Sequence, residues 1–281
     1  MKCRDRQVTG ETFGICRCHD CGFMFTRGAP AEEEIGRYYE SPAYIPHSDT
    51  RRGLISGAYH LVRRIMLVRK AALVRKCCHL SGGTLLDIGT GTGYFPDYMH
   101  RHGWTVSATE KSADARRFAA EHFGLDVMPP EALFLQKDDE YDAITMWHVT
   151  EHLERLDRTW YQAYRSLKKN GVLIVAVPNP RSFDAGVYGK DWAAYDVPRH
   201  LWHFTPSAMQ RFGAKHGFIL AERHTMPFDA FYVSMLTEKQ MRHWFPIPRG
   251  FLVGLQGWAA SLVKKDKSSS ITYIFRKKIT E

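Results

Sequence analysis

The chain has 281 residues, of which 44% are hydrophobic and 13% aromatic, a composition that excludes a chain disordered throughout. No stretch approaches 18 uncharged apolar residues, which excludes a membrane-spanning helix, and residues 1–13 lack the apolar core of a signal peptide, so we expect a cytoplasmic protein. The formal net charge of +9 predicts an anionic partner without identifying it.

The first segment, residues 1–27, carries cysteines at spacings that do not suggest a disulfide framework. Cys18-x-x-Cys21 followed by glycine is typical of half a zinc knuckle, because such a turn points two thiolates at one metal ion. The candidate ligands are Cys3, Cys16, Cys18 and Cys21, with His19 as an alternative to Cys16. A Zn²⁺ site and a metal-free, packed turn both remain open for this segment.

Residues 28–80 are predicted to be mainly helical. In the second half, apolar residues recur at helical spacing between three basic pairs: Arg63-Arg64, Arg69-Lys70 and Arg75-Lys76. This pattern favours an amphipathic helix with a solvated basic face. A face that docks phosphate groups is the alternative.

Strands and helices alternate from about residue 81 to 223. Apolar runs predict strands at 84–89, 104–110, 125–129, 141–147, 171–179, 218–224 and, near the end, 270–277. Helices are predicted at 94–103, 112–124, 157–171 and 205–217, with Ser112 as one N-cap and Thr205 or Ser207 as another. This alternation indicates an α/β, doubly wound sheet that binds ligands at the carboxyl ends of its strands.

The first of these strands leads into a glycine-rich loop, Asp87-Ile-Gly89-Thr-Gly91-Thr-Gly93. A dinucleotide-binding loop would have its third glycine at position 94, where this chain has Tyr94, and a P-loop would end in Gly-Lys-Ser/Thr. Glu110 ends the next strand, where a carboxylate can accept hydrogen bonds from both hydroxyls of a ribose.

The glycine loop and Glu110 resemble motifs of the class I S-adenosylmethionine-dependent methyltransferases. The stretch 141–153 and the strand 171–179 resemble two further motifs of the same family. The resemblance implies a Rossmann-like sheet in the order 3-2-1-4-5-7-6, with strand seven antiparallel. It makes residues 81–281 the methyltransferase domain and residues 224–270 a lid-like insertion between strands six and seven.

S-adenosylmethionine would be the cofactor, and the residues expected to bind it are Asp87, Gly89, Thr90, Gly91, Gly93, Tyr94, Phe95, Glu110, Lys111, Ala132, Leu133 and Trp147. The Cys-x-x-Cys-Gly-Phe and Asp-x-Pro-Arg-His-x-x-His-Phe-Thr blocks resemble a bacterial subgroup of the family.

Two segments carry the candidate catalytic residues. His148 follows the strand 141–147, either as a general base or as a wall of the cofactor site. Arg199 and His200 lie in an aromatic block at 191–206 that is predicted to face the substrate, although an ordered crossover packed on its own aromatic residues is the alternative.

Glu151 and His152 complete a stretch that resembles quinone-biosynthesis O-methyltransferases, whose ExxEH motif can hold a divalent metal ion. Here His148 replaces the first glutamate, so we favour a structural role for this pair.

The predicted function is O-methylation of a small-molecule, glycan or lipid-linked acceptor. The basic charge predicts an anionic acceptor, and the apolar 224–270 segment predicts an amphiphilic acceptor or peripheral membrane contact. One alternative is an RNA methyltransferase with a zinc knuckle. The basic charge favours this alternative, whereas the absence of an Asn/Asp-Pro-Pro-Tyr/Phe motif argues against it. The other is a cofactor-binding scaffold without catalysis.

Overall fold

The computed structural model describes residues 1–39 and 54–278. Its main sheet has seven strands in the order β10-β11-β8-β7-β4-β5-β6. The strands are β4 (Thr84–Ile88), β5 (Thr105–Thr109), β6 (Val127–Met128), β7 (Tyr141–Trp147), β8 (Leu167–Pro178), β10 (Phe218–Thr225) and β11 (Ser270–Lys277). β11 pairs antiparallel with both β8 and β10, whereas the strands from β8 to β6 run parallel. The predicted order, 3-2-1-4-5-7-6, is therefore confirmed.

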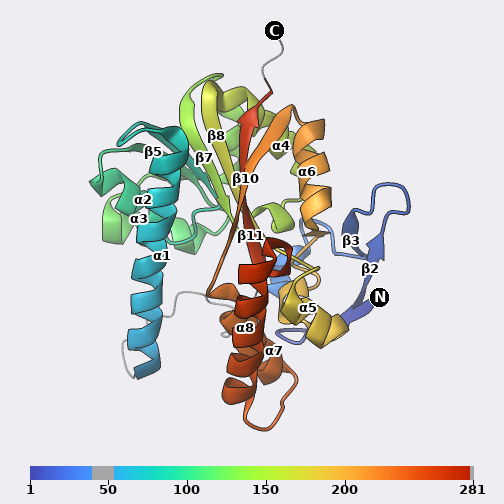
Figure 1. Cartoon of the computed structure of the whole chain (residues 1–281). Helices are drawn as coiled ribbons and strands as arrows, with labels where there is room; N and C mark the ends of the chain where they lie inside the picture. The colour runs from blue at the N-terminus through green and yellow to red at the C-terminus, as the bar shows by residue number, and fades with distance from the viewer. Residues whose placement is uncertain (40–53, 279–281) are drawn as a thin grey trace.

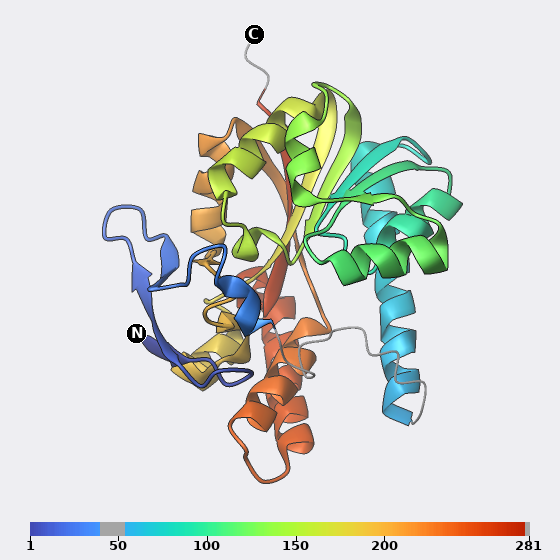
Figure 2. The ribbon, with the colours of Figure 1, turned by 180° about the vertical axis from the view of Figure 1, so that it is seen from behind.

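Helices cover both faces of this sheet (Figures 1 and 2). They are α1 (Leu54–Cys78), α2 (Tyr94–Arg101), α3 (Ala113–Phe123), η2 (Pro130–Leu135), α4 (Leu156–Ser166) and α6 (Pro206–Lys215). The second half of β8 is a continuous apolar run because both faces of the sheet are covered, and its residues from Val172 to Val177 are at most 1% exposed. The predicted caps form: Ser112 accepts from the backbone N–H of Ala115, and Thr205 from that of Ala208.

The boundary between α4 and β8 differs from the prediction. We predicted that the helix runs to Gly171, but α4 ends at Ser166 and β8 begins at Leu167. Leu167 is fully buried and pairs with Tyr141, and the register shifts before the next pair, Ala143 with Val172. Burial of the leucine in the core, together with this bulge, overrides the helical pattern of the polar residues.

The N-terminal segment forms a small antiparallel sheet. β1 (Lys2–Arg4), β2 (Thr12–Arg17) and β3 (Met24–Arg27) pair in order, and β9 (Trp202–His203) adds a fourth strand from the crossover after β8. Their apolar side chains pack with η1 (Ile35–Tyr38) and with the crossover elements α5 (Phe183–Tyr188) and η5 (Ala193–Tyr195), between which lies η4 (Gly189–Asp191). Of the predicted helical stretch 28–80, residues 40–53 lie outside the described residues.

Between β10 and β11 the chain forms a helical hairpin, α7 (Asp229–Gln240) and α8 (Pro246–Val263), followed by η6 (Lys265–Lys267). Figure 1 shows this hairpin below the sheet, at the end opposite the C-terminus. α8 packs closely on α7 because Gly250 and Gly254 face that helix. A Cβ atom at Gly250 would lie 2.4 Å from the α7 backbone, and one at Gly254 would lie 2.6 Å from it. The large apolar side chains of α8 consequently point outward. In residues 1–39 and 54–278 no helix is long and apolar enough to cross a membrane.

Candidate functional site

The glycine loop joins β4 to α2 at the carboxyl edge of the sheet. Gly89, Gly91 and Gly93 all have positive φ angles, of 71°, 60° and 87°. A Cβ atom at Gly89 would lie 2.4 Å from Cγ2 of Val149, and one at Gly93 would lie 2.9 Å from the Cβ of Ala119. The loop thus requires glycine for its conformation and for its close packing, and its bare backbone is left as a cradle.

Glu110 lies beside this cradle and is fixed by the backbone. Its Oε2 atom accepts from the N–H of Gly91, and its Oε1 atom accepts from the N–H of Ser112, each at 2.8 Å. Each carboxylate oxygen retains a further lone pair, so Glu110 can still accept hydrogen bonds from a bound ligand. Its neighbour Lys111 instead forms an exposed ion pair with Glu154, with an N–O distance of 2.5 Å.

Asp87 is buried below the loop and contacts the adjacent strand. Its carboxylate accepts a hydrogen bond from the hydroxyl of Thr145, which is also its partner in the parallel register. Burial raises the pKa of Asp87 to about 6, against the opposing effect of that hydrogen bond. The side chain is 2% exposed, so Asp87 shapes the loop from beneath.

The aromatic residues near the loop point in different directions. Tyr94 packs edge-to-face on Phe123 and lies under the guanidinium of Arg63, at 3.9 Å from the ring centroid, which explains why a large residue fits where dinucleotide-binding loops have glycine. Phe95 packs edge-to-face against Trp147. The indole N–H of Trp147 is buried and has no hydrogen-bond acceptor among the described residues.

Lys70 of α1 lies over the same tryptophan, with its ammonium 4.6 Å from the ring centroid. The helical pattern predicts a solvated position for Lys70, yet burial lowers the pKa of this lysine. The two η2 residues predicted to bind the cofactor differ in exposure. Leu133 is buried in the main core, and Ala132 is half-buried at its edge.

His148 follows β7 in the left-handed region, with a φ of 59°. Its Nδ1 lies 3.4 Å from Oε1 of Glu151, and its Nε2 lies 3.3 Å from Oδ2 of Asp229. Burial alone would lower the pKa of His148, but these contacts with the carboxylates of Asp229 and Glu151 outweigh it and raise the pKa to about 9. His148 is therefore held protonated at neutral pH. Asp229 lies in an apolar run, and no sequence motif singles it out.

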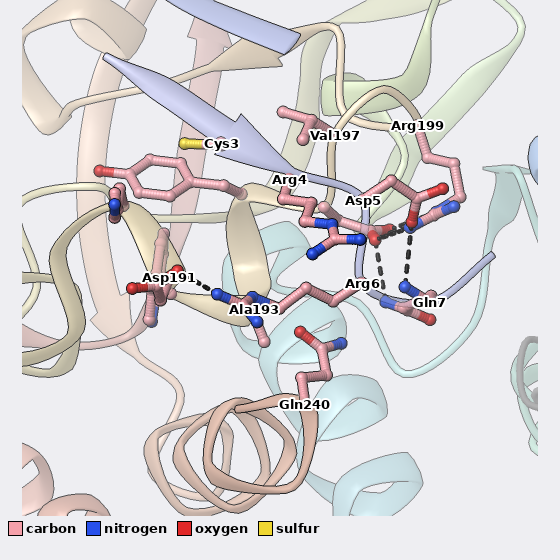
Figure 3. A pocket seen from close by; sticks show the side chains of 14 residues that line it. Cys3, Arg4, Asp5, Arg6, Gln7, Asp191, Ala193, Val197, Arg199 and Gln240 are labelled. Carbon is pink, nitrogen blue, oxygen red and sulfur yellow. Dashed lines mark hydrogen bonds and ion pairs between the residues drawn. The ribbon is translucent and has the colours of Figure 1, made fainter. Parts of the chain in front are cut away.

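The structure does not place Arg199 at a cleft wall. Its side chain is 1% exposed and donates to Asp5, to Asp196 and to the carbonyl of Tyr38. Figure 3 shows Arg199 beside a surface pocket at the junction of the N-terminal strand with the crossover. None of the predicted cofactor residues lines that pocket. The expectation that Arg199 faces a substrate at the sheet edge is therefore corrected, because the guanidinium neutralises buried carboxylates inside the protein.

The rest of the aromatic block is packed in the same way. Trp192, Tyr195 and Phe204 are at most 6% exposed, which agrees with the alternative of a crossover packed on its own side chains. His200 is also buried: its Nδ1 lies 2.9 Å from the carbonyl oxygen of Ala194. Burial and the nearby His152 lower the pKa of His200 well below its usual range, so the imidazole is neutral.

The structure does not support the predicted zinc knuckle. Cys18 and Cys21 lie together at the β2–β3 turn, where hydrogen bonds from Cys21 lower the pKa of the Cys18 thiol. Cys3 is buried in β1 opposite Phe13, and Cys16 pairs with Phe25 in β2. Within the described residues no group of three potential ligands includes a cysteine, so the four sulfurs do not form one cluster.

Comparisons with known proteins match this architecture. A family model described as "Methyltransferase domain" matches residues 60–222, more than half of the chain. The ubiquinone biosynthesis O-methyltransferase of Rhodopseudomonas palustris is 25% identical over 183 residues, which cover 59% of this chain and 72% of that protein. The enzyme of the same name from Caulobacter vibrioides is 30% identical over 145 residues, which cover 47% of this chain and 57% of that protein.

Among solved structures, the fold is similar to that of geranyl diphosphate C-methyltransferase from Streptomyces coelicolor, in complex with Mg²⁺, geranyl diphosphate and S-adenosyl-L-homocysteine. The TM-score is 0.54 at 15% identity, covering 83% of this chain and 85% of that one. It is also similar to the [4+2]-cyclase SpnF, with a TM-score of 0.52 at 22% identity, covering 75% and 82% of the two chains. At these identities the likeness establishes the fold alone.

Proposed function

The chain belongs to the methyltransferase domain family as a class I S-adenosylmethionine-dependent methyltransferase, and from this premise we propose that it methylates an oxygen atom of a small amphiphilic acceptor. The observation that carries the cofactor part is the pairing of a bare glycine cradle with the fixed carboxylate of Glu110. The acceptor part draws on the two relatives described as O-methyltransferases and on the residues around the cradle.

The residues at the cradle fit S-adenosylmethionine, whose sulfonium centre supplies the methyl group. We assign the ribose hydroxyls to Glu110 and the methionine part to the backbone of Gly89–Gly93. Lys70 and Trp147 contact each other at the carboxyl end of β7, and the indole N–H of Trp147 has no acceptor among the described residues. A cation and a free donor suit the methionine carboxylate.

The acceptor side of the site is assigned to His148 and Asp229. Transfer of a methyl group from a sulfonium is an in-line displacement: the bond from acceptor oxygen to carbon forms as the carbon–sulfur bond breaks, so alignment contributes much of the catalysis. The His148–Asp229 pair lies at the carboxyl end of β7. Because His148 is protonated, the carboxylate of Asp229 is the group of the pair that can accept a hydrogen bond from an acceptor hydroxyl and take its proton as the oxygen–carbon bond forms. This supports an acceptor with a free hydroxyl group.

The exposed surface of the hairpin supports an amphiphilic acceptor. Trp244, Phe245, Leu252, Leu262 and Val263 are between 59% and 91% exposed. Exposed basic residues flank this apolar face at both ends: Arg242, Arg249, Lys264, Lys265 and Lys267. Apolar side chains edged by cations suit the surface of an anionic membrane, from which an amphiphilic acceptor could be taken.

Calorimetric titration with S-adenosyl-L-homocysteine, with NADH as the control ligand, tests the cofactor part. Transfer of a labelled methyl group from S-adenosylmethionine then tests the acceptor part. The acceptors are an alkylated phenol, the same compound with its hydroxyl already methylated, and a transcribed RNA. We expect label on the free phenol alone. Label on the blocked compound would contradict O-methylation, and label on RNA would favour the nucleic-acid alternative.

A further inference from the structure

Three potential metal ligands from two distant segments meet beside the rim of the sheet. Glu151 and His152 belong to η3 (Thr150–His152), directly after β7, whereas His200 lies in the crossover that follows β8. One ligand atom from each lies within 4.8 Å of the other two. A backbone hydrogen bond of 2.8 Å, from the N–H of Leu201 to the carbonyl of Glu151, holds the two segments together. Among the residues that the structure describes, this is the sole group of its kind.

Both histidines are oriented by backbone carbonyls. Nδ1 of His152 lies 2.9 Å from the carbonyl oxygen of Arg199, and Nδ1 of His200 lies 2.9 Å from that of Ala194. A carbonyl oxygen can only accept, so each Nδ1 carries the hydrogen and each Nε2 keeps a free lone pair. A hydrogen bond of this kind on one ring nitrogen is what holds a metal-binding histidine in place. The two rings are 4.5 Å apart and meet edge-to-face.

Glu151 is buried beside the two histidines. The residue is 1% exposed, and its Oε1 lies 3.4 Å from Nδ1 of the protonated His148. Among the described residues, no group donates a well-aligned hydrogen bond to either carboxylate oxygen. A buried carboxylate is costly unless its oxygens are well hydrogen-bonded or bound to a metal ion, so Glu151 keeps the capacity to bind a further cation.

We propose that Glu151, His152 and His200 form a binding site for a divalent transition-metal ion. Two imidazole nitrogens and one carboxylate suit Zn²⁺ and similar ions better than Mg²⁺, which prefers an all-oxygen environment. Three protein ligands leave at least one coordination position for water or another oxygen ligand. The bound ion would also join the η3 turn to the crossover.

This donor set differs from the one that the quinone-type motif suggests. That motif would place its donors at positions 148, 151 and 152, but here His148 is directed toward Asp229 as well as Glu151. His200, from the block after β8, takes the third place. The proposed metal site consists of these three side chains, so binding of the ion can be measured without an assay of methyl transfer.

The test is Zn²⁺ binding by the full chain after treatment with a chelator, measured by calorimetry and by metal content after dialysis. Cys18→Ser and Cys21→Ser are present throughout, so that thiolate-bound zinc is not counted. We expect one Zn²⁺ per chain and no comparable binding of Mg²⁺. His200→Gln should weaken Zn²⁺ binding by about 100-fold or more, because loss of a ligand costs at least as much as loss of its supporting hydrogen bond.

His203→Gln is the matched control. His203 lies three residues further along, is equally buried, and contacts Thr26 outside the group. It should leave Zn²⁺ binding unchanged, and so should His148→Gln. The proposal is overturned if Zn²⁺ does not bind, if His200→Gln binds like the parent, or if His148→Gln abolishes binding. If His200→Gln does not fold by circular dichroism, Glu151→Gln answers the same question.

Discussion

Nε2 of His148 and Oδ2 of Asp229 lie 3.3 Å apart and join two separate parts of the chain. His148 follows the central strand β7, and Asp229 is the first residue of α7 in the insertion between β10 and β11. The imidazole lowers the pKa of Asp229, against the raising effect of burial, so the contact is an ion pair at neutral pH. The helical hairpin is thereby attached to the rim at which the methyl acceptor is proposed to bind.

Breaking this contact should impair use of the acceptor and leave cofactor binding intact. Asp229→Asn and His148→Ala are each expected to lower kcat/KM for the acceptor by about 10-fold, corresponding to about 1.4 kcal/mol for a partly exposed ion pair. The double variant should lose little more than either single one, because both remove the same interaction. Asp266→Asn, which removes an ion pair with Arg223 in the same insertion, is the control. Additive losses would show that the two residues act independently.

Glu110 should control affinity for the cofactor. In Glu110→Gln one side-chain oxygen remains but the charge is lost, and the amide must place an N–H beside the backbone N–H of Gly91 or Ser112. We expect affinity for S-adenosyl-L-homocysteine to fall by about 10- to 100-fold, the range for a hydrogen bond to a charged group. Glu121→Gln on the exposed face of α3 should bind as the parent does. Equal affinity of the Glu110 variant would remove this residue from the cofactor site.

The main sheet and the cradle could be predicted because their signals are local. Apolar runs mark strands that are covered on both faces, and glycines at 89, 91 and 93 mark a backbone with positive φ. The order of the strands came from the family resemblance, and the pairing of β11 between β8 and β10 confirms it.

The remaining features depend on contacts between residues far apart in sequence. Arg199 was expected in a cleft because its aromatic block follows the strand 171–179 at the rim of the sheet, but its carboxylate partner Asp5 lies directly after β1, far away in the sequence. Lys70 belongs to a basic helix pattern, and only the position of Trp147 makes it half-buried. The cysteine spacing was compatible with a knuckle, but it carries no information on strand pairing, which separates Cys3 from Cys18.

The Asp5–Arg199 ion pair should anchor the N-terminal sheet. Oδ1 of Asp5 lies 3.0 Å from Nη2 of Arg199, and both side chains are at most 1% exposed. Asp5→Asn should reduce the free energy of unfolding at pH 7 by about 2 kcal/mol, since it removes one of the two ionised partners of Arg199 and weakens the hydrogen bonds that the Asp5 carboxylate accepts. Urea unfolding measures this loss, and Asp20→Asn, at an exposed position, should change stability by less than about 0.5 kcal/mol.

The same pair predicts how stability depends on pH. Burial would raise the pKa of Asp5, but hydrogen bonds from the backbone of Thr9 and from Arg199 hold it below its usual value of 3.8. A carboxyl with a lowered pKa stabilises the fold fully above its unfolded pKa and loses that contribution as the pH falls through its folded pKa. The difference in stability between the parent and Asp5→Asn should therefore be constant near neutrality and narrow below about pH 4. A difference that does not narrow would exclude the ionised carboxylate as its source.

The exposed face of α8 should bind anionic membranes. Leu252 and Leu262 are 59% and 67% exposed, so replacing both by glutamate removes apolar surface and adds negative charge without disturbing the core. In sedimentation with vesicles containing phosphatidylglycerol, the double variant should bind at least about 10-fold more weakly, since burial of one leucine contributes about 1.5–3 kcal/mol. Leu135→Glu, at an 82% exposed position on η2, is the control for a charge placed elsewhere.

If the parent binds neutral and anionic vesicles equally, the basic residues beside α8 play no part in membrane binding. If the double variant binds as the parent does, α8 is not the contact surface, and the amphiphilic acceptor loses its structural support.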